Sequence, residues 1–244
     1  MENQHIDLSV VIPAFNEENR IFKSLDAIDT YLSSKNLRYE IIVVDDGSND
    51  NTPSIVKAFC KTHARAFYTT YGKNMGKGYA VRQGVNISKG YFVLFSDADL
   101  STPIEEIEKL IKAIKSGYDI SIGSRALSDS EIIISQPFYR KTIGKIFNIL
   151  VRLLIFGGIK DTQCGFKCFT GTAVKKIFSK CRINGFSFDV EALFIGKKLG
   201  FKIMDIPIQW INSPESRVHP IKHSLAMIKE LLQIRWNEMR GLYK

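Results

Sequence analysis

Short apolar runs alternate with longer amphipathic stretches along the first half of the chain, and polar or turn-forming residues close each run. Apolar runs of about four to eight residues predict strands, and stretches with a period near 3.6 residues predict helices. The predicted strands are Leu8–Pro13, Glu40–Val44, Tyr91–Ser96 and Asp119–Ile122. The predicted helices are Glu18–Ser33, Thr52–His63, Gly78–Ser88 and Pro103–Ser116. We expect Ser101 or Thr102 to cap the last helix, with Pro103 in its first turn.

This alternation of strands and helices predicts an α/β fold with a mostly parallel, Rossmann-like central sheet and helices on both faces. The continuous apolar run Ile41–Val44 is typical of a strand that is buried on both sides. The second half differs: it predicts a long amphipathic helix over Tyr139–Phe156, a strand-like segment over Lys202–Ile211 and a last amphipathic helix over Ile221–Met239. With no linker or repeat, residues 1–244 are interpreted as one domain with a C-terminal helical elaboration.

Polar residues follow each of the four predicted strands of the first half. In a parallel sheet, ligands bind at the carboxyl ends of the strands, where the loops converge. In chain order, the residues at these ends are Pro13, Phe15 and Glu17, then Asp45 and Asp46, then Asp97, Ala98 and Asp99, then Ser124 and Arg125. Four such ends directed at one crevice predict a binding site.

Asp97 and Asp99 form the centre of this predicted site. Strand alternation places both carboxylates on one side and Ala98 on the other. Two carboxylates this close repel each other unless a cation lies between them, and oxygen ligands suit Mg²⁺ or Mn²⁺. The alternative is that one aspartate caps a helix while the other is solvated. Arg125 is placed for a diphosphate contact, although a surface salt bridge is the ordinary role of a single arginine.

The remaining strand ends suit a nucleoside diphosphate. Asp46 can accept a hydrogen bond from a uracil N–H group, and Glu17 can accept from ribose hydroxyls, whereas Asp45 is also consistent with an Asp-Gly-Ser turn. The segment Asn74–Gly78 precedes a helix, and its glycines, the helix amino terminus and Lys77 together suit an anion. Its spacing matches neither the Walker A motif nor the dinucleotide-binding motif.

The positive charge of the chain is concentrated in one segment. The formal net charge is +9, and residues 140–182 contain ten lysines and arginines but one acid, Asp161. The same segment holds the most apolar stretch, Ile146–Ile159, which Asn148 and Arg152 make too short and too polar to span a bilayer. A basic, apolar surface suits an anionic membrane, and no nucleic-acid-binding module is present. A solvated basic face over a core helix is the alternative.

The start of the chain lacks the features of a signal peptide, and the four scattered cysteines predict reduced thiols. We therefore expect a cytoplasmic protein.

Taken in order, the motifs resemble the family-two glycosyltransferases with the GT-A fold. The motifs that carry this resemblance are Val11–Glu17, Val44–Ser48, Asn74–Gly78, Asp97–Pro103 and Gly123–Arg125. Two later motifs, Asp161–Lys167 and Phe186–Glu191, are similar to those of the dolichyl-phosphate glucosyltransferase branch. The resemblance spans Leu8 to about Arg217.

The resemblance implies a role for each matching residue. It implies nucleotide-sugar contacts at Pro13, Phe15, Glu17, Asp46, Lys77, Asp97, Ala98 and Arg125, and a Mg²⁺ or Mn²⁺ ion at Asp97 and Asp99. Ser101 stands where related mannosyl enzymes have a glutamine ligand, which agrees with the glucosyl branch and leaves the third protein ligand open. Arg217 resembles a basic residue that engages phosphate from a C-terminal loop. Residues 1–126 are thereby interpreted as the nucleotide-sugar-binding half and 127–244 as the acceptor- and membrane-facing half.

The implied reaction is an inverting transfer of glucose from UDP-glucose to a polyprenyl monophosphate. The predicted catalytic residues are Asp97, Asp99, Arg125 and Asp189, with Glu191 as a further acidic candidate near the acceptor. Arg140, Lys167 and Arg217 are expected to bind the acceptor phosphate. We expect peripheral association with the cytoplasmic face of a membrane, through the apolar residues of the basic segment, Ile146, Phe147, Leu150, Leu153, Leu154 and Phe156. Many proteins of the resembled family carry transmembrane helices and none is visible in this sequence, so a membrane-protein partner or a homo-oligomer is also consistent with it.

Three alternatives remain at this point. They are a sugar-phosphate nucleotidyltransferase, a glycosyltransferase with another donor or a soluble acceptor, and a non-catalytic binding protein that has kept the fold.

Overall fold

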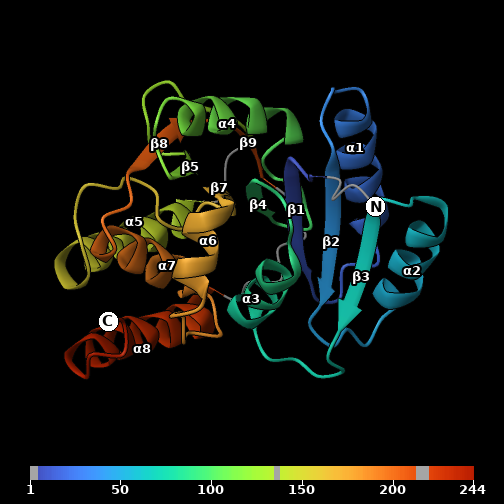
Figure 1. The fold of residues 1–244 in the computed structure, drawn as a ribbon. Helices are drawn as coiled ribbons and strands as arrows, with labels where there is room; N and C mark the ends of the chain where they lie inside the picture. Colours follow the sequence, from blue (N-terminus) through green and yellow to red (C-terminus); the bar gives the residue numbers. More distant parts are fainter. Residues whose placement is uncertain (1–4, 135–137, 213–219) are drawn as a thin grey trace.

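A seven-stranded sheet with the order β3-β2-β1-β4-β7-β5-β8 lies at the centre of the molecule (Figure 1). The structure is a computed structural model that describes residues 5–134, 138–212 and 220–244. The strands are β1 (Leu8–Ala14), β2 (Tyr39–Asp45), β3 (Ala66–Thr70), β4 (Phe92–Ser96), β5 (Ile120–Ser124), β7 (Phe166–Thr170) and β8 (Ile203–Pro207). β7 pairs antiparallel with both neighbours, and the other pairings in this sheet are parallel. The predicted mostly parallel α/β fold is therefore confirmed.

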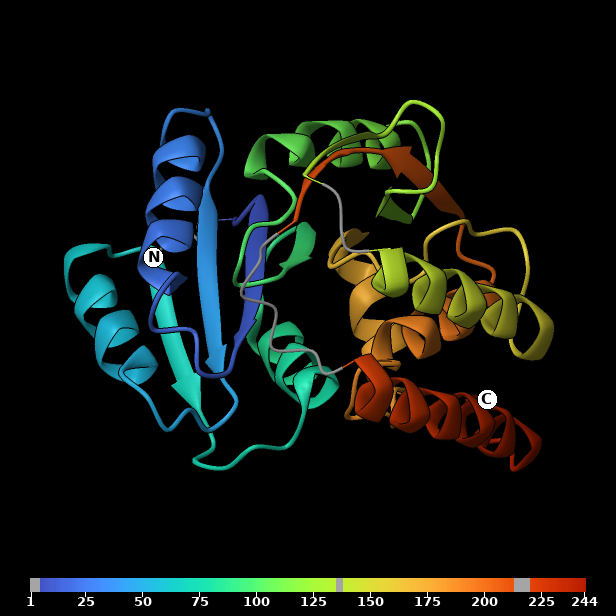
Figure 2. The same cartoon turned by 180° about the vertical axis from the view of Figure 1, so that it is seen from behind.

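Helices cover both faces of the sheet. One face carries α1 (Ile21–Ser33), α2 (Thr52–Thr62) and α4 (Ile107–Lys115). The other carries α3 (Lys77–Ile87), α5 (Phe138–Leu154), α6 (Gly171–Phe178), α7 (Phe188–Lys198) and α8 (Pro220–Met239). Figures 1 and 2 show α5 to α8 gathered on the side of the molecule opposite to α1 and α2.

The two faces of the sheet bury separate apolar cores. Along β1, Val11 packs into the core under α3, whereas Val10 and Ile12 pack into the core under α1 and α4. Every residue of β1 and β2 is buried, as the continuous apolar runs predict.

Several elements were not predicted from the sequence pattern. They are β3, β7, α6, α7 and β6 (Glu131–Ile134). β7 was not predicted because Lys167 interrupts its apolar run. This strand is nevertheless buried and joins the two parallel parts of the sheet. The segment Lys202–Ile211 forms two strands rather than one: β8 lies in the main sheet, and β9 (Gln209–Ile211) pairs with β6 in a separate two-stranded sheet.

The predicted cap of the fourth helix is wrong. The helix begins as a short 3-10 turn, η1 (Ile104–Glu106), for which Pro103 is the N-cap residue, and no side chain caps it. None of the described helices is long and apolar enough to cross a bilayer.

Candidate active site

Asp97 and Asp99 lie in the turn that follows β4. The Asp97 side chain is 35% exposed, and its Oδ1 atom lies 2.6 Å from Nζ of Lys77. Asp99 accepts a hydrogen bond from the N–H group of Ser101 and lies 3.7 Å from a guanidinium nitrogen of Arg20. Ala98 points the other way into the core, as predicted, and its carbonyl accepts from Ser24.

Gly165 is a site residue that the sequence reasoning missed. Because β7 runs antiparallel, it begins at the edge of the sheet where β4 ends, and the carbonyl of Gly165 accepts from the N–H group of Asp97. A Cβ atom on Gly165 would lie 2.0 Å from Oδ2 of Asp97. Glycine at this position therefore leaves the space that the Asp97 carboxylate occupies. The signal in the sequence was the glycine within the motif Asp161–Lys167.

The glycines around Lys77 serve a different purpose from the one predicted. A Cβ atom on Gly76 would lie 2.4 Å from the carbonyl oxygen of Asn184. That carbonyl accepts from the N–H groups of Gly78 and Tyr79, so protein backbone already satisfies these donors at the amino terminus of α3. The glycines of this loop admit the segment around Asn184, so the backbone N–H groups of Gly78 and Tyr79 are occupied, and the anion contact stays a prediction for Lys77. Lys77 nevertheless points at Asp97.

Burial and charge oppose each other at Lys77. Burial lowers the pKa of the Lys77 ammonium, but the Asp97 carboxylate outweighs burial and raises this pKa overall. Lys77 is therefore cationic at neutral pH and is held next to the carboxylate pair.

Asp45 and Asp46 hold neighbouring loops in place. Asp45 accepts from the N–H group of Ser48, which confirms the turn-forming role that was the alternative for this residue. Asp46 is buried and accepts from the Tyr71 hydroxyl and from the N–H groups of Met75 and Gly76. Its contact with uracil stays a prediction, and the structure adds that Asp46 also fixes the loop that carries Lys77.

The end of β1 places Pro13 within the strand and leaves Phe15 partly exposed. The carboxylate of Glu17 is paired with the guanidinium of Arg20, so a ribose hydroxyl would share it with that arginine. Asn16, between Phe15 and Glu17, adopts φ of 56°, and this left-handed backbone is stabilised by a hydrogen bond from its N–H group to Ser48. Non-glycine residues in this region cost about 1 kcal/mol or more and cluster at functional sites.

Arg125 forms a bidentate ion pair with Asp161, with nitrogen–oxygen distances of 2.6 and 2.8 Å. The Arg125 side chain is 28% exposed, and its guanidinium also lies over the ring of Trp210. Burial alone would lower the pKa of Arg125, but the buried Asp161 carboxylate raises it. The salt bridge that was the alternative for Arg125 is therefore present. Its carboxylate comes from Asp161, the first residue of the motif Asp161–Lys167. A small pocket at the end of β4 is lined by Ser96, Asp97, Ser101, Thr102, Gly165 and Trp210.

Lys167 was expected to receive the acceptor phosphate, and this expectation is wrong. Its side chain is fully buried, with Nζ 3.2 Å from Asp189 and bonded to the carbonyl of Cys164. Burial raises the pKa of Asp189, although the ammonium groups of Lys167 and Lys77 oppose this effect. Lys167 and Asp189 are therefore an internal charge pair beside Lys77, within the core under the site.

Glu191 has a structural role in the core, and its position near the acceptor stays a prediction. It is fully buried and accepts from the N–H groups of Arg182 and Ile183 and from the hydroxyl of Tyr243. This carboxylate ties the segment before α7 to the end of the chain.

The basic, apolar segment 140–182 does not form one surface. Lys167 is internal, and Lys175 bonds to carbonyl groups at the end of α3. Of the residues expected at a bilayer interface, Phe147 and Phe156 are buried in the core, Leu150 and Leu154 are partly buried, and Ile146 and Leu153 are 54% and 77% exposed. The side chain of Arg140 and the whole of Arg217 lie outside the described residues, so their predicted contact with acceptor phosphate stays a prediction.

The carboxylate pair is compatible with a divalent metal ion. Oδ1 of Asp97 is buried and its partner among the described residues is the Lys77 ammonium at 2.6 Å, while Asp99 offers a second hard oxygen donor in the same turn. The described residues contain no group of three or more histidine, cysteine, aspartate or glutamate side chains arranged to hold a metal. An ion held here would take its other ligands from water and phosphate oxygens.

Comparison with known proteins agrees with this geometry. The model of the family described as glycosyl transferase family 2 matches residues 9–178. The chain belongs to glycosyl transferase family 2. It is 34% identical to a dolichyl-phosphate beta-glucosyltransferase of Dictyostelium discoideum, over 98% of this chain and 77% of that protein. It is 36% identical to the human protein of that name (97% and 77%) and 37% identical to that of Saccharomyces cerevisiae (100% and 78%).

Solved structures confirm the fold of this family 2 glycosyltransferase. Glucosyl-3-phosphoglycerate synthase from Mycobacterium tuberculosis, in complex with Mn²⁺, UDP and phosphoglyceric acid, superposes with a TM-score of 0.70 at 18% identity, over 94% of this chain and 77% of that chain. A complex of the same enzyme with Mn²⁺ and UDP-glucose gives 0.70 at 17% identity, over 94% and 79%. All four cysteines are free, as expected.

Proposed function

We propose that this glycosyltransferase moves glucose from UDP-glucose to a polyprenyl monophosphate and releases UDP. Relatives named dolichyl-phosphate beta-glucosyltransferase, which match nearly the whole chain, support the donor and the acceptor. The observation that carries the proposal is the Asp97 carboxylate, which lies 2.6 Å from the Lys77 ammonium at the end of β4. A carboxylate that can hold a metal, next to a fixed cation, suits a diphosphate leaving group.

The proposed step is a single displacement that inverts the configuration at the sugar. An oxygen of the acceptor phosphate forms a bond to C1 of glucose, and the bond from C1 to the UDP oxygen breaks with its electron pair on UDP. The acceptor phosphate is ionised at neutral pH, so no side chain has to remove a proton. This agrees with Asp189, which is paired with Lys167 in the core rather than placed as a base.

We propose that Lys77 makes the main contribution to stabilising the negative charge on the leaving diphosphate. Both cations are paired with an aspartate, but the partner of Lys77 is Asp97, which the proposed metal ion would also engage, whereas Arg125 keeps its bidentate pair with the buried Asp161 and so attracts a diphosphate less than a free guanidinium does. Arg125 is therefore proposed to orient the phosphates from beside the pocket. Preorganised cations of this kind are commonly the largest contribution to transition-state stabilisation.

We propose that Asp97 and Asp99 hold Mg²⁺ or Mn²⁺. Solved structures of the same fold were obtained with Mn²⁺ or Mg²⁺ and UDP, which supports a divalent ion. When bound, such an ion supplies charge neutralisation to phosphate oxygens.

The acceptor is a membrane lipid in this proposal, so we propose peripheral association with the cytoplasmic face of a membrane. Residues 1–126 supply the residues assigned to the donor. The second half contributes β7 to the same sheet, so the two halves interleave.

The decisive experiment supplies purified protein with Mn²⁺, polyprenyl phosphate and one radiolabelled donor at a time. UDP-glucose, UDP-galactose, UDP-N-acetylglucosamine and GDP-mannose are compared, and the lipid products are separated. We expect a glucolipid from UDP-glucose that disappears in Asp99→Ala and persists in Asp26→Ala, which removes an exposed aspartate of α1.

Other results would identify the alternatives. Product with a soluble phosphate acceptor but none with the lipid would indicate a soluble-acceptor enzyme. Release of pyrophosphate from UTP and glucose-1-phosphate would indicate a nucleotidyltransferase. Full activity of Asp99→Ala would refute the metal role.

A further inference from the structure

Helix α8 exposes an apolar face on the side away from the core. Leu231 and Ile234 are fully buried and attach the helix to the core under α7. The residues that we name the α8 outer face are between 56% and 71% exposed: Leu225, Leu232, Trp236 and Met239. At 3.6 residues per turn these four fall within an arc of about 60°, opposite the buried residues.

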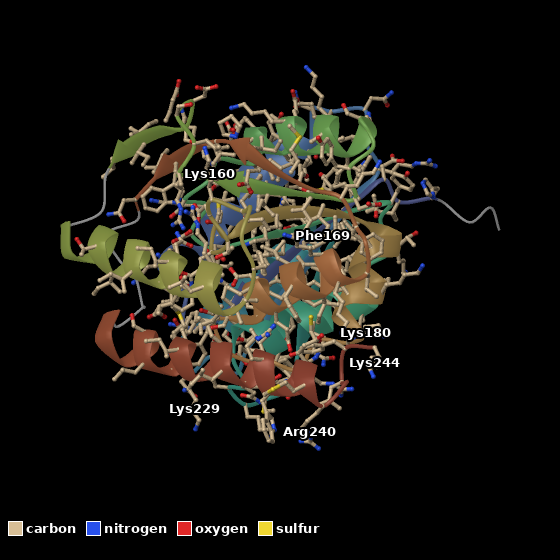
Figure 3. The ribbon with its side chains drawn as sticks, turned by 90° about the vertical axis from the view of Figure 1, so that its left-hand side faces the viewer. Lys160, Phe169, Lys180, Lys229, Arg240 and Lys244 are labelled. Carbon is tan, nitrogen blue, oxygen red and sulfur yellow. The ribbon has the colours of Figure 1, made fainter. Side chains whose placement is uncertain are left out.

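Cations accompany this face. Lys229 lies about 20° beyond one edge of this arc, and Arg235 and Arg240 flank the arc on either side; all three are exposed. Figure 3 shows Lys229 and Arg240 directed away from the body of the molecule along its lower edge, with Lys244 and Lys180 higher up at its right-hand side.

The acidic residues of α8 are turned inward. Glu230 accepts from the N–H group of Ser187 at the start of α7, and Glu238 pairs with Lys198 at 2.6 Å. The charges that α8 presents outward within the described residues are therefore positive. A helix with apolar residues on one face, flanked by cations, is typical of elements that lie in a membrane interface.

We propose that the α8 outer face is the surface by which this chain docks on an anionic lipid bilayer, with Trp236 at the interface. Tryptophan is enriched at the boundary between headgroups and acyl chains, and each lysine or arginine near an anionic leaflet adds attraction. A second copy of the chain fits this face less well, because a two-fold interface would bring Lys229, Arg235 and Arg240 of both copies together. The inference rests on the proposed function, since a lipid acceptor gives membrane docking its use.

The position of this face differs from the one expected from sequence. On α5, which packs beside α8, Phe147 is buried, and Ile149 and Leu153 are among the exposed apolar residues. α5 therefore serves as the competing surface in the test.

The experiment is vesicle flotation without donor or acceptor, using phosphatidylcholine alone or mixed with phosphatidylglycerol. We expect the protein to float with the anionic vesicles. The double variant Leu232→Ser/Trp236→Ser should lower the bound-to-free ratio by at least about tenfold, because two large apolar side chains no longer enter the bilayer. Arg235→Gln/Arg240→Gln should lower it by roughly fivefold per charge. Phe67→Ser, at an exposed phenylalanine of the edge strand β3, is the matched control and should float like the wild type.

A second measurement locates the contact on the chain. The protein has two tryptophans, and Trp210 is buried, so quenching by lipids with brominated acyl chains reports on Trp236. We expect quenching in anionic vesicles that is lost in Trp236→Phe.

Three results would overturn the proposal: unchanged flotation of Leu232→Ser/Trp236→Ser, loss of flotation in Ile149→Ser/Leu153→Ser alone, or a dimer in solution that the α8 variant dissociates. Failure of the proposed function can be distinguished from failure of the docking proposal by measuring transfer to a short-chain polyprenyl phosphate in detergent, because this reaction does not need the bilayer. The α8 variant should keep that activity within about twofold, and unchanged urea unfolding excludes a folding defect.

Discussion

Gly165 offers the sharpest test of the site, because its side-chain hydrogen faces the carboxylate proposed to hold the metal. In Gly165→Ala the new Cβ atom would lie 2.0 Å from Oδ2 of Asp97, whereas ordinary contacts begin at 3.4 Å. The carboxylate must therefore withdraw by about 1.4 Å. The backbone of Gly165 is not in the left-handed region, so alanine itself adds no backbone strain.

The expected consequence is a large loss of activity with little loss of stability. A misplacement of about 1 Å at a reacting centre costs on the order of 100-fold in rate. The Asp97 side chain is 35% exposed, so it has room to move without disturbing the core. We expect kcat/KM for UDP-glucose to fall by roughly 100-fold and Mn²⁺ affinity in the presence of UDP to fall as well.

The assay is steady-state transfer to polyprenyl phosphate, with Mn²⁺ titrated in parallel and unfolding followed in urea. Gly157→Ala is the matched control, because a Cβ atom there meets no atom within 4 Å. If Gly165→Ala retained wild-type kcat/KM and Mn²⁺ affinity, the position of the Asp97 carboxylate would be irrelevant and the proposed metal site would be wrong.

Three further predictions concern charges around the site. Lys77→Met should weaken UDP binding by at least about tenfold, because a hydrogen bond to a charged group is lost. The same variant should strengthen Mn²⁺ binding in the absence of nucleotide, because the competing ammonium is gone. Calorimetry that showed both affinities falling would contradict this prediction. Asp161→Asn should lower the free energy of unfolding at pH 7 by roughly 3 kcal/mol, because Arg125 keeps a buried charge without its partner. Burial alone would raise the pKa of the Asp161 carboxyl, but the Arg125 guanidinium lowers it below the ordinary value of 3.8, so the ion pair stabilises the fold above that pH. In urea unfolding, the stability difference between the wild type and Asp161→Asn should therefore disappear as the pH falls through the pKa of Asp161 in the folded protein. Tyr243→Phe should cost about 1.5–3 kcal/mol in the same assay, because the buried Glu191 carboxylate loses a donor, and a change below 0.5 kcal/mol would show that water replaces it.

The first half of the fold was accessible from sequence because its signals are local. The runs at Leu8–Pro13 and Glu40–Val44 are apolar apart from Ser9 and Glu40, and a strand buried on both faces explains such a pattern over so few residues. The position of Asp97 and Asp99 followed from the same logic, because residues after a parallel strand lie at its carboxyl edge.

Only the tertiary structure decided which side chains are buried and what they contact, because these properties depend on which distant segments of the chain meet. Lys167 resembles a surface ligand in sequence, but β7 enters the sheet antiparallel, and the lysine is buried against Asp189. The glycines beside Lys77 resemble a phosphate loop, but they admit the backbone around Asn184.

The same division holds at the surface and at the carboxylate pair. The sequence determined that α8 is amphipathic, whereas packing decided which apolar residues it buries and that Trp236 stays exposed. The sequence also determined which carboxylates end β4. The insertion of β7 then decided that Gly165 leaves space for one of them, and the position of α3 placed Lys77 beside it. Contacts between residues so far apart leave no periodic trace in the chain.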